Sequence, residues 1–172
     1  MKYITAPWRA AYVRTAAAHR GCVLCRAAKT RDDAEAHVLV RGRHAFVLLN
    51  KYPYQPGHLM IAPLLHLASP EDAPPALLAE MAALLRRSLG ALRTAYAPHG
   101  FNTGMNLGRS AGAGVVGHFH LHVVPRWEGD ANFMPIVGRT KVLIEDLDAT
   151  FARLRPLLAA RRGAGRPEAA RR

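Results

Sequence analysis

Gly117-His-Phe-His-Leu-His-Val-Val-Pro-Arg-Trp127 is the most informative stretch of this sequence. Its histidines alternate with apolar residues, and in a β-strand alternate side chains share one face. Residues 118–124 are therefore predicted to form a strand whose apolar side chains face the core. Three imidazoles in a row fill space poorly and repel one another when charged, so the opposite face is predicted to be a chemical site. Its candidate residues are His118, His120 and His122.

A glycine-rich loop leads into this strand. Residues 106–114 read Asn-Leu-Gly-Arg-Ser-Ala-Gly-Ala-Gly. Glycine allows consecutive main-chain amides to converge on an anion. Because the loop comes directly before a row of histidines, it indicates a site for a phosphate group.

The rest of the chain predicts an α+β domain with an antiparallel sheet flanked by helices. Val- and Leu-rich segments bounded by turn residues predict strands, the first three as antiparallel neighbours, over residues 37–40, 44–50, 58–62 and 101–107. Apolar residues at spacings of three and four predict an amphipathic helix over 74–96, and two prolines suit its start. Shorter helices are expected over residues 5–19 and 145–160.

Length and composition indicate one domain. The chain has 172 residues, half of them hydrophobic, which is enough for a single core. We expect the domain to cover residues 1–160. The remaining residues, 161–172, are basic and poor in large apolar side chains, so a disordered tail is expected there.

The charge narrows the partners only a little. With 24 Lys and Arg against 12 Asp and Glu, the formal net charge is +12, which suits an anionic partner. The basic residues are scattered and form no known nucleic-acid motif, so nucleic acid is not expected as the partner. No run of roughly 18 apolar residues is present, so no membrane partner is expected and we expect a soluble, cytoplasmic protein.

The two cysteines, Cys22 and Cys25, are the only ones in the chain. Their CxxC spacing is too close for an ordinary disulfide framework and suits one metal ion. The same spacing also occurs in redox motifs and by chance. On its own the pair therefore leaves a metal site, a redox pair and two reduced thiols open.

The histidine strand and its surroundings resemble the histidine-triad (HIT) family. The family pattern, His-x-His-x-His followed by two apolar residues, is met at positions 118–124. Upstream, residues 46–50 and Tyr54-Gln-Pro-Gly-His-Leu-Met-Ile-Ala-Pro63 resemble the strand, loop and strand of the family's nucleotide pocket. The similarity covers a core of about residues 37–135. Within the family, residues 125–134 and 100–102 are most similar to bacterial diadenosine tetraphosphate phosphorylases and their hydrolase-like relatives.

The resemblance implies a reaction with a covalent intermediate. His120 would attack the α-phosphorus of a nucleotide and form a nucleotidyl-histidine, which water or inorganic phosphate then releases. His122 would bind the phosphate and help the leaving oxygen depart. A neutral imidazole suits the nucleophile, because its ordinary pKa of about 6.5 leaves one nitrogen unprotonated at neutral pH.

The resemblance also implies binding roles. The non-bridging phosphate oxygens would be held by Asn106, Ser110 and the amides of the turn from Gly112 to Gly114. Asn50 would face the ribose, and His58 would support the nucleophile strand. Adenine is the expected base, and a homodimer or larger homo-oligomer is the expected assembly.

The acceptor in the second step is left open. At Gly114 the sequence departs from the phosphorylases, which have a hydroxyl residue before the triad that would bind the attacking phosphate. The chain is therefore expected to be a nucleotide hydrolase or nucleotidyltransferase that acts on a dinucleoside polyphosphate or a related nucleotide. Phosphorolysis of diadenosine tetraphosphate and a non-catalytic nucleotide sensor are the alternatives.

Zinc-bearing relatives, including the hexose-phosphate uridylyltransferases, supply the ligands that the cysteine pair lacks. The corresponding residues here are His66 and His118, and the complete set is Cys22, Cys25, His66 and His118. A closed set of two cysteines and two histidines implies a structural Zn²⁺. A different hypothesis takes the three histidines of residues 117–127 as ligands of a catalytic metal.

Overall fold

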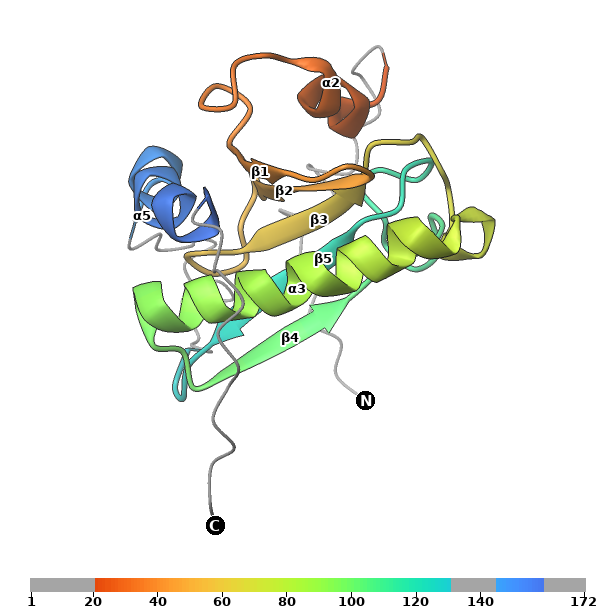
Figure 1. Ribbon diagram of the computed structural model, residues 1–172. Coiled ribbons are helices and arrows are strands. Elements are labelled where there is room, and N and C mark those ends of the chain that lie inside the picture. Colours follow the sequence, from red (N-terminus) through yellow and green to blue (C-terminus); the bar gives the residue numbers. More distant parts are fainter. Residues whose placement is uncertain (1–20, 131–144, 160–172) are drawn as a thin grey trace, which may run out of the picture.

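A five-stranded antiparallel sheet forms the centre of the molecule (Figure 1). The computed structural model describes residues 21–130 and 145–159. The strands are β1 (Val38–Arg41), β2 (Ala45–Leu49), β3 (Leu59–Pro63), β4 (Gly100–Gly104) and β5 (Leu121–Arg126). Their order across the sheet is β1-β2-β3-β5-β4, and each neighbouring pair is antiparallel. The predicted sheet and its first three neighbouring strands are confirmed.

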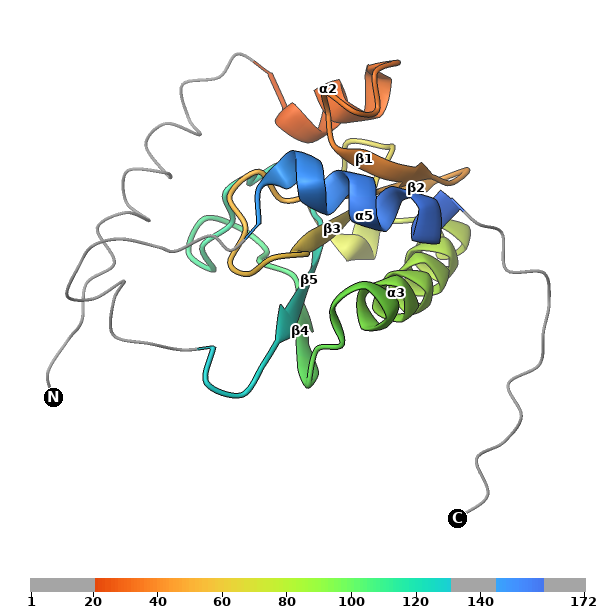
Figure 2. The same cartoon turned by 90° about the vertical axis from the view of Figure 1, so that its left-hand side faces the viewer.

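Helices cover both faces of this sheet (Figures 1 and 2). The long helix α3 (Pro75–Tyr96) and the helix α5 (Leu147–Ala159) pack on one face, and the short helix α2 (Val23–Lys29) packs on the other. Strand β2 is buried along its whole length because its alternate residues serve both layers: Val47 joins the core under α3 and α5, and Phe46 joins the core under α2. Ser69 leads into a single 3-10 turn, Pro70–Asp72, before α3.

The alternation predicted for the histidine stretch is confirmed. His122 lies opposite Met60 of β3, and Met60 packs in the cluster on the α2 side. Leu121 and Val123 pack in the cluster on the α3 side, together with Phe119. One face of this segment is therefore core, and the other carries imidazoles.

The strand itself differs from the predicted range of 118–124. Strand β5 begins only at Leu121 and continues to Arg126. The reason lies in the hydrogen bonds: the main-chain N–H of Phe119 donates to the carbonyl of Leu67 at 2.8 Å, beyond the end of β3. Residues 118–120 have thus left the regular ladder and are held by the chain segment that follows β3.

Other differences are smaller. The predicted strand 101–107 is shorter, because β4 ends at Gly104. The cysteine pair lies at the start of α2, where Cys22 is the N-cap residue. The helices predicted over 74–96 and 145–160 are confirmed as α3 and α5. The helix predicted over 5–19 and the tail 161–172 lie outside the described residues. None of the described helices combines the length and the apolar character needed to span a bilayer.

Candidate active site and metal centre

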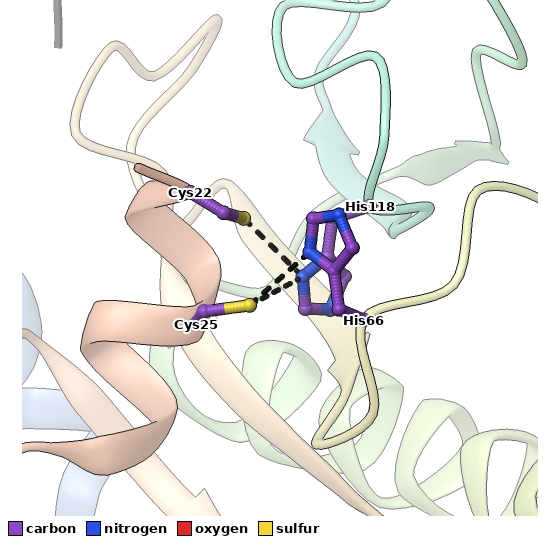
Figure 3. Close-up of side chains that lie close together, drawn as sticks. All are labelled: Cys22, Cys25, His66 and His118. Carbon is purple, nitrogen blue, oxygen red and sulfur yellow. Dashed lines mark hydrogen bonds between the residues drawn. The ribbon is translucent and has the colours of Figure 1, made fainter. Parts of the chain in front are cut away.

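Four side chains from three separate segments meet beside α2 (Figure 3). Cys22 and Cys25 come from the start of α2, His66 from the segment after β3, and His118 from the segment before β5. One ligand atom from each lies within 4.8 Å of all the others. The fold therefore brings together all four residues that the sequence predicted as metal ligands.

The distances in this cluster fit a tetrahedral ion. The Nδ1 atom of His118 lies 3.3 Å from the Sγ of Cys22 and 3.5 Å from the Sγ of Cys25, and the Nδ1 of His66 lies 3.2 Å from the Sγ of Cys25. Around a tetrahedral zinc, with bonds of about 2.3 Å to sulfur and about 2.0 Å to nitrogen, the sulfur and nitrogen ligands stand about 3.5 Å apart. Burial raises the pKa of the Cys25 thiol, and the neighbouring Cys22 adds to the rise. A bound cation would offset this rise, because it favours the thiolate form.

The ring of His118 presents a lone pair to the cysteines. Its Nε2–H donates to the carbonyl of Pro63 at 2.9 Å, which leaves Nδ1 unprotonated in the neutral ring. Burial lowers the pKa of His118, and the neighbouring His66 and His120 lower it further. A neutral imidazole with its free nitrogen toward two sulfurs is the form that ligates a metal.

His120 has the opposite tautomer. Its Nδ1–H donates to the main-chain carbonyl of His118 at 3.0 Å, so the lone pair of the neutral ring is on Nε2. The side chain is buried, and burial lowers its pKa, which keeps the ring neutral. The ring lies next to His122, with centroids 4.7 Å apart. His120 thus has the unprotonated nitrogen that a nucleophile requires.

His58 sets the tautomer of His122. The main-chain N–H of Tyr54 donates to Nδ1 of His58 at 3.0 Å, so the proton of His58 is on Nε2. That Nε2–H donates to Nδ1 of His122 at 3.0 Å, and His122 therefore keeps its own proton on Nε2. Sequence reasoning gave His58 a supporting role, and the structure brings it into direct contact with His122.

The position of His58 depends on the glycine before it. Gly57 has a φ of +74°, a conformation that favours glycine, and a Cβ atom there would lie 2.9 Å from Leu92 of α3. The loop thus presses directly against α3. The exposed ring of Tyr54 stacks on His58 with centroids 4.8 Å apart.

A cleft of about 460 Å³ opens beside His122. Residues that line it include Tyr54, Asn102, Asn106, His122, Val124 and Arg126. The alternation of β5 puts His122, Val124 and Arg126 on one face, so extending the histidine period past Pro125 would have found Arg126 in the sequence. Sequence reasoning missed Arg126, Tyr54 and Asn102 as site residues.

Arg126 is held rigidly in this cleft. Its guanidinium donates two hydrogen bonds to the carboxylate of Asp130, each 2.6 Å long, and one to Oδ1 of Asn102 at 2.6 Å. The hydrogen bond from Arg126 lowers the pKa of Asp130 to about 2. The cleft is therefore lined by an arginine that is fixed in a bidentate pair.

The predicted binding residues fall into two groups. Asn106 and His122 both line the cleft, and contact of Asn106 with a phosphate stays a prediction. Asn50 is buried, and its Oδ1 accepts the main-chain N–H of Tyr52 at 2.9 Å, so it shapes the loop before β3. Contact of Asn50 with a ribose stays a prediction.

The glycine-rich loop uses two of its amides internally. The N–H of Gly112 donates to the carbonyl of Arg109 at 2.9 Å, and that of Ala113 donates to Gly108 at 3.3 Å. Ser110 is exposed, and Gly114 is half-buried. The amide of Gly112 is thus directed into the loop, and roles of Ser110 and Gly114 in phosphate binding stay predictions.

The three histidines do not converge on one ion. His118 turns toward the cysteines, and His122 bonds to His58. Within residues 21–130 and 145–159, the cluster of Cys22, Cys25, His66 and His118 is the one group of three or more metal-binding side chains whose ligand atoms meet. The geometry therefore does not support the hypothesis of a catalytic metal on the triad.

Comparison with known proteins points in the same direction as this geometry. Residues 31–129 match the HIT domain model. An AP-4-A phosphorylase of Mycobacterium tuberculosis is 45% identical over 112 residues, which are 65% of this chain and 57% of that protein. The match thus spans little more than half of that relative. An uncharacterized HIT-like protein of the same species is 32% identical and matches 63% of this chain and 74% of its own length.

Solved structures share the fold. A Zn-bound histidine triad family protein from Mycobacterium smegmatis superimposes with a TM-score of 0.58 at 25% identity, covering 87% of this chain and 92% of that one. A hypothetical histidine triad nucleotide-binding protein from Sulfolobus tokodaii gives a TM-score of 0.59 at 26% identity, with 72% and 83% covered. The antiparallel sheet with its flanking helices is thus the fold found in these proteins.

Proposed function

Because this chain belongs to the HIT domain family, we propose that it is a nucleotide-processing enzyme that cleaves at the α-phosphate of a dinucleoside polyphosphate or a related nucleotide. The observation that supports this most directly is the tautomer of His120. Its Nδ1–H is bound to a main-chain carbonyl, and its Nε2 lone pair lies in a buried ring beside His122. A neutral imidazole held in this way can attack an electrophilic centre such as phosphorus.

The reaction takes place in two displacements. In the first, Nε2 of His120 attacks the α-phosphorus, a P–N bond forms, and the P–O bond to the leaving group breaks. The leaving polyphosphate takes the electron pair as an anion, which the Nε2–H of His122 stabilises by a hydrogen bond. The His118 carbonyl accepts from Nδ1–H of His120 and so stabilises the positive charge that develops on the ring.

In the second displacement an acceptor oxygen attacks the same phosphorus. The P–N bond breaks and its electron pair returns to Nε2 of His120. With water as acceptor, the proton of the attacking water passes to solvent and the product is a nucleoside monophosphate. With inorganic phosphate as acceptor, the product is a nucleoside diphosphate. We propose hydrolysis for this chain, since Gly114 lacks the hydroxyl group that a bound phosphate would need.

Phosphorolysis is the second candidate. It is favoured by the 45% identity to a protein named AP-4-A phosphorylase, although the match covers 57% of that protein. A nucleotide sensor without turnover is a third reading, and the geometry of His120 argues against it.

One experiment separates these three activities. The protein is incubated with diadenosine tetraphosphate, with and without inorganic phosphate, and the products are resolved by ion-exchange chromatography. AMP with ATP in both samples supports hydrolysis, whereas ADP with ATP only in the presence of phosphate shows phosphorolysis. Binding of the nucleotide with no product in either sample would contradict an enzymatic role.

We further propose that Cys22, Cys25, His66 and His118 hold a structural Zn²⁺. The donor set of two sulfurs and two nitrogens, the ligand spacing and the neutral His118 ring fit a closed tetrahedral site. Bound there, the ion would join α2 to the two segments beside the nucleophile. Metal analysis by mass spectrometry should find about one zinc per chain, and Cys25→Ser should lose it.

The proposal also covers how the nucleotide binds and which oligomer the chain forms. The cleft beside His122 would take the rest of the nucleotide, with adenine as the expected base and Arg126 toward the phosphate chain. A homodimer or larger homo-oligomer is proposed, and light scattering of the full chain tests it.

A further inference from the structure

The nucleophile candidate stands just outside the regular sheet. Strand β5 pairs with β3 only at Leu121, His122 and Val123, so His120 precedes the first of these pairs. The ladder that fixes the rest of β5 therefore does not fix His120. Its position depends on whatever holds residues 118–120.

Two main-chain carbonyls hold these residues, one at the last residue of β3 and one in the segment that follows it. The Nε2–H of His118 donates to Pro63, and the N–H of Phe119 donates to Leu67 at 2.8 Å. His66 lies between these two anchor points, and its ring packs edge-on against that of His118, with centroids 5.1 Å apart. The two segments thus run together through the metal cluster.

His118 connects this cluster to His120 with two different groups. Its ring has Nδ1 toward Cys22 and Cys25, and its main-chain carbonyl accepts the Nδ1–H of His120. The ring and the carbonyl are both parts of His118, so their orientations are coupled. A change in how the ring is held therefore moves the acceptor that selects the tautomer of His120.

We propose that the cluster of Cys22, Cys25, His66 and His118, when it holds its ion, positions His120 and keeps its lone pair on Nε2. This inference rests on the proposed role of His120. His66 and His118 act as positioning residues: neither touches the substrate, and both act through the carbonyl of His118. The cluster thus contributes to the rate of the reaction in addition to stability.

The test uses the full-length zinc-loaded protein and the variant His66→Ala. His66 is exposed and lies outside the cleft, so its loss removes one ligand without removing a substrate contact. We expect His66→Ala to lose zinc and to show kcat lower by roughly 10- to 100-fold, as for other groups that orient a reactive residue from a distance, with KM little changed. His66→Cys supplies a fourth ligand again, now a sulfur, and should restore both zinc and kcat.

A spectroscopic measurement separates positioning from general destabilisation. The ¹⁵N shifts of the His120 ring, assigned by comparison with His120→Gln, report which nitrogen is protonated. Zinc-loaded protein should show the proton on Nδ1, and His66→Ala should show a mixture of both tautomers. If His66→Ala does not fold, removal of zinc from the unaltered protein with a chelator gives the same measurement.

A matched control is His37→Asn. Nε2 of His37 forms a hydrogen bond with Asp148 of α5, away from the cluster, and asparagine tolerates the φ of 51° at this position. This variant should keep zinc, kcat and the His120 shifts. Loss of zinc from His66→Ala with unchanged kcat and unchanged shifts would overturn the inference. A wild-type protein that turns over no nucleotide, yet whose His120 shifts change with zinc, would overturn the proposed function and leave the positioning role intact.

Discussion

His118 and His120 are two residues apart and are chemically opposite. Each uses one ring nitrogen to donate to a main-chain carbonyl, but His118 donates from Nε2 and His120 from Nδ1. The nitrogen left with the lone pair is therefore Nδ1 in one ring and Nε2 in the other. The first lies beside two sulfurs and the second beside His122. The carbonyl that each ring meets thus decides which nitrogen keeps the lone pair, and so whether the ring suits the proposed role of ligand or that of nucleophile.

Removing the proposed nucleophile tests this comparison with the largest expected effect. His120→Ala removes the attacking nitrogen and few binding contacts. We expect kcat to fall by on the order of 10⁴-fold or more, with nucleotide affinity within about tenfold of wild type. Chromatography of the products and calorimetry with a non-reactive nucleotide measure the two quantities. A rate near that of the wild type would rule out His120 as the nucleophile.

The pairing between His58 and His122 gives the second prediction. His58→Leu removes the donor that selects the tautomer of His122, and kcat is expected to fall by roughly 10²-fold. His58→Gln is the matched variant, because its amide N–H can still donate to Nδ1 of His122, and it should recover part of this loss. Equal rates in the two variants would mean that His58 fills space and sets no tautomer.

The sheet and its helices could largely be predicted from the sequence, because the signals involved are local. Alternation marks the strands, and the spacing of leucines marks α3. The start of β5 could not be predicted in this way. Residues 118–120 alternate like a strand, but the N–H of Phe119 bonds to Leu67, and which carbonyl it meets is decided by tertiary structure.

The site could be predicted only in part, because some of its features depend on tertiary contacts. The candidate metal ligands could be located by resemblance, and the fold places them together. The tautomers could not be predicted, since each depends on a carbonyl or ring from a distant segment, such as Pro63 or His58. Arg126 and Asn102 were missed because they follow or lie outside the triad pattern, although the period of two extends to Arg126.

The cleft gives a third prediction, which concerns substrate binding and not the rate of the chemical step. Exchange of Arg126 for Gln together with Asp130→Asn removes the ion pair and leaves no unpaired carboxylate. We expect KM for a dinucleoside polyphosphate to rise by about fivefold with kcat little changed, since a cation near the phosphate chain contributes about 1 kcal/mol. Asp130→Asn alone is the control, because it keeps the cation. An equal loss in kcat would instead place Arg126 at the reacting phosphorus.

A substitution far from both the metal cluster and His120 should have the smallest effect on activity. Glu80 of α3 accepts main-chain N–H groups from Arg43, His44 and Ala45 at 2.8, 2.5 and 3.0 Å. Burial alone would raise the pKa of Glu80, but these hydrogen bonds outweigh it and hold the pKa below its ordinary value of 4.5. Glu80→Gln should lower the free energy of unfolding by about 1–2 kcal/mol and leave kcat unchanged.

The pH dependence of that loss has a definite sign. A carboxylate whose folded pKa is depressed stabilises the protein above its unfolded pKa, and this stabilisation is lost as the pH falls through the folded value. Denaturant unfolding should therefore show the largest gap between wild type and Glu80→Gln at neutral pH, and the gap should close below pH 4.5. A gap that stays constant to lower pH would show that the charge of Glu80 is irrelevant.

The tight contact of Gly57 with α3 has a consequence for protein engineering. Any larger residue at this position would have to push against Leu92 and would also adopt an unfavourable φ. A combinatorial library aimed at new substrates can therefore vary the exposed Tyr52 and Tyr54 of the same loop while keeping Gly57 constant. Screening would then vary this loop, including Tyr54 at the cleft, without displacing the ring of His58.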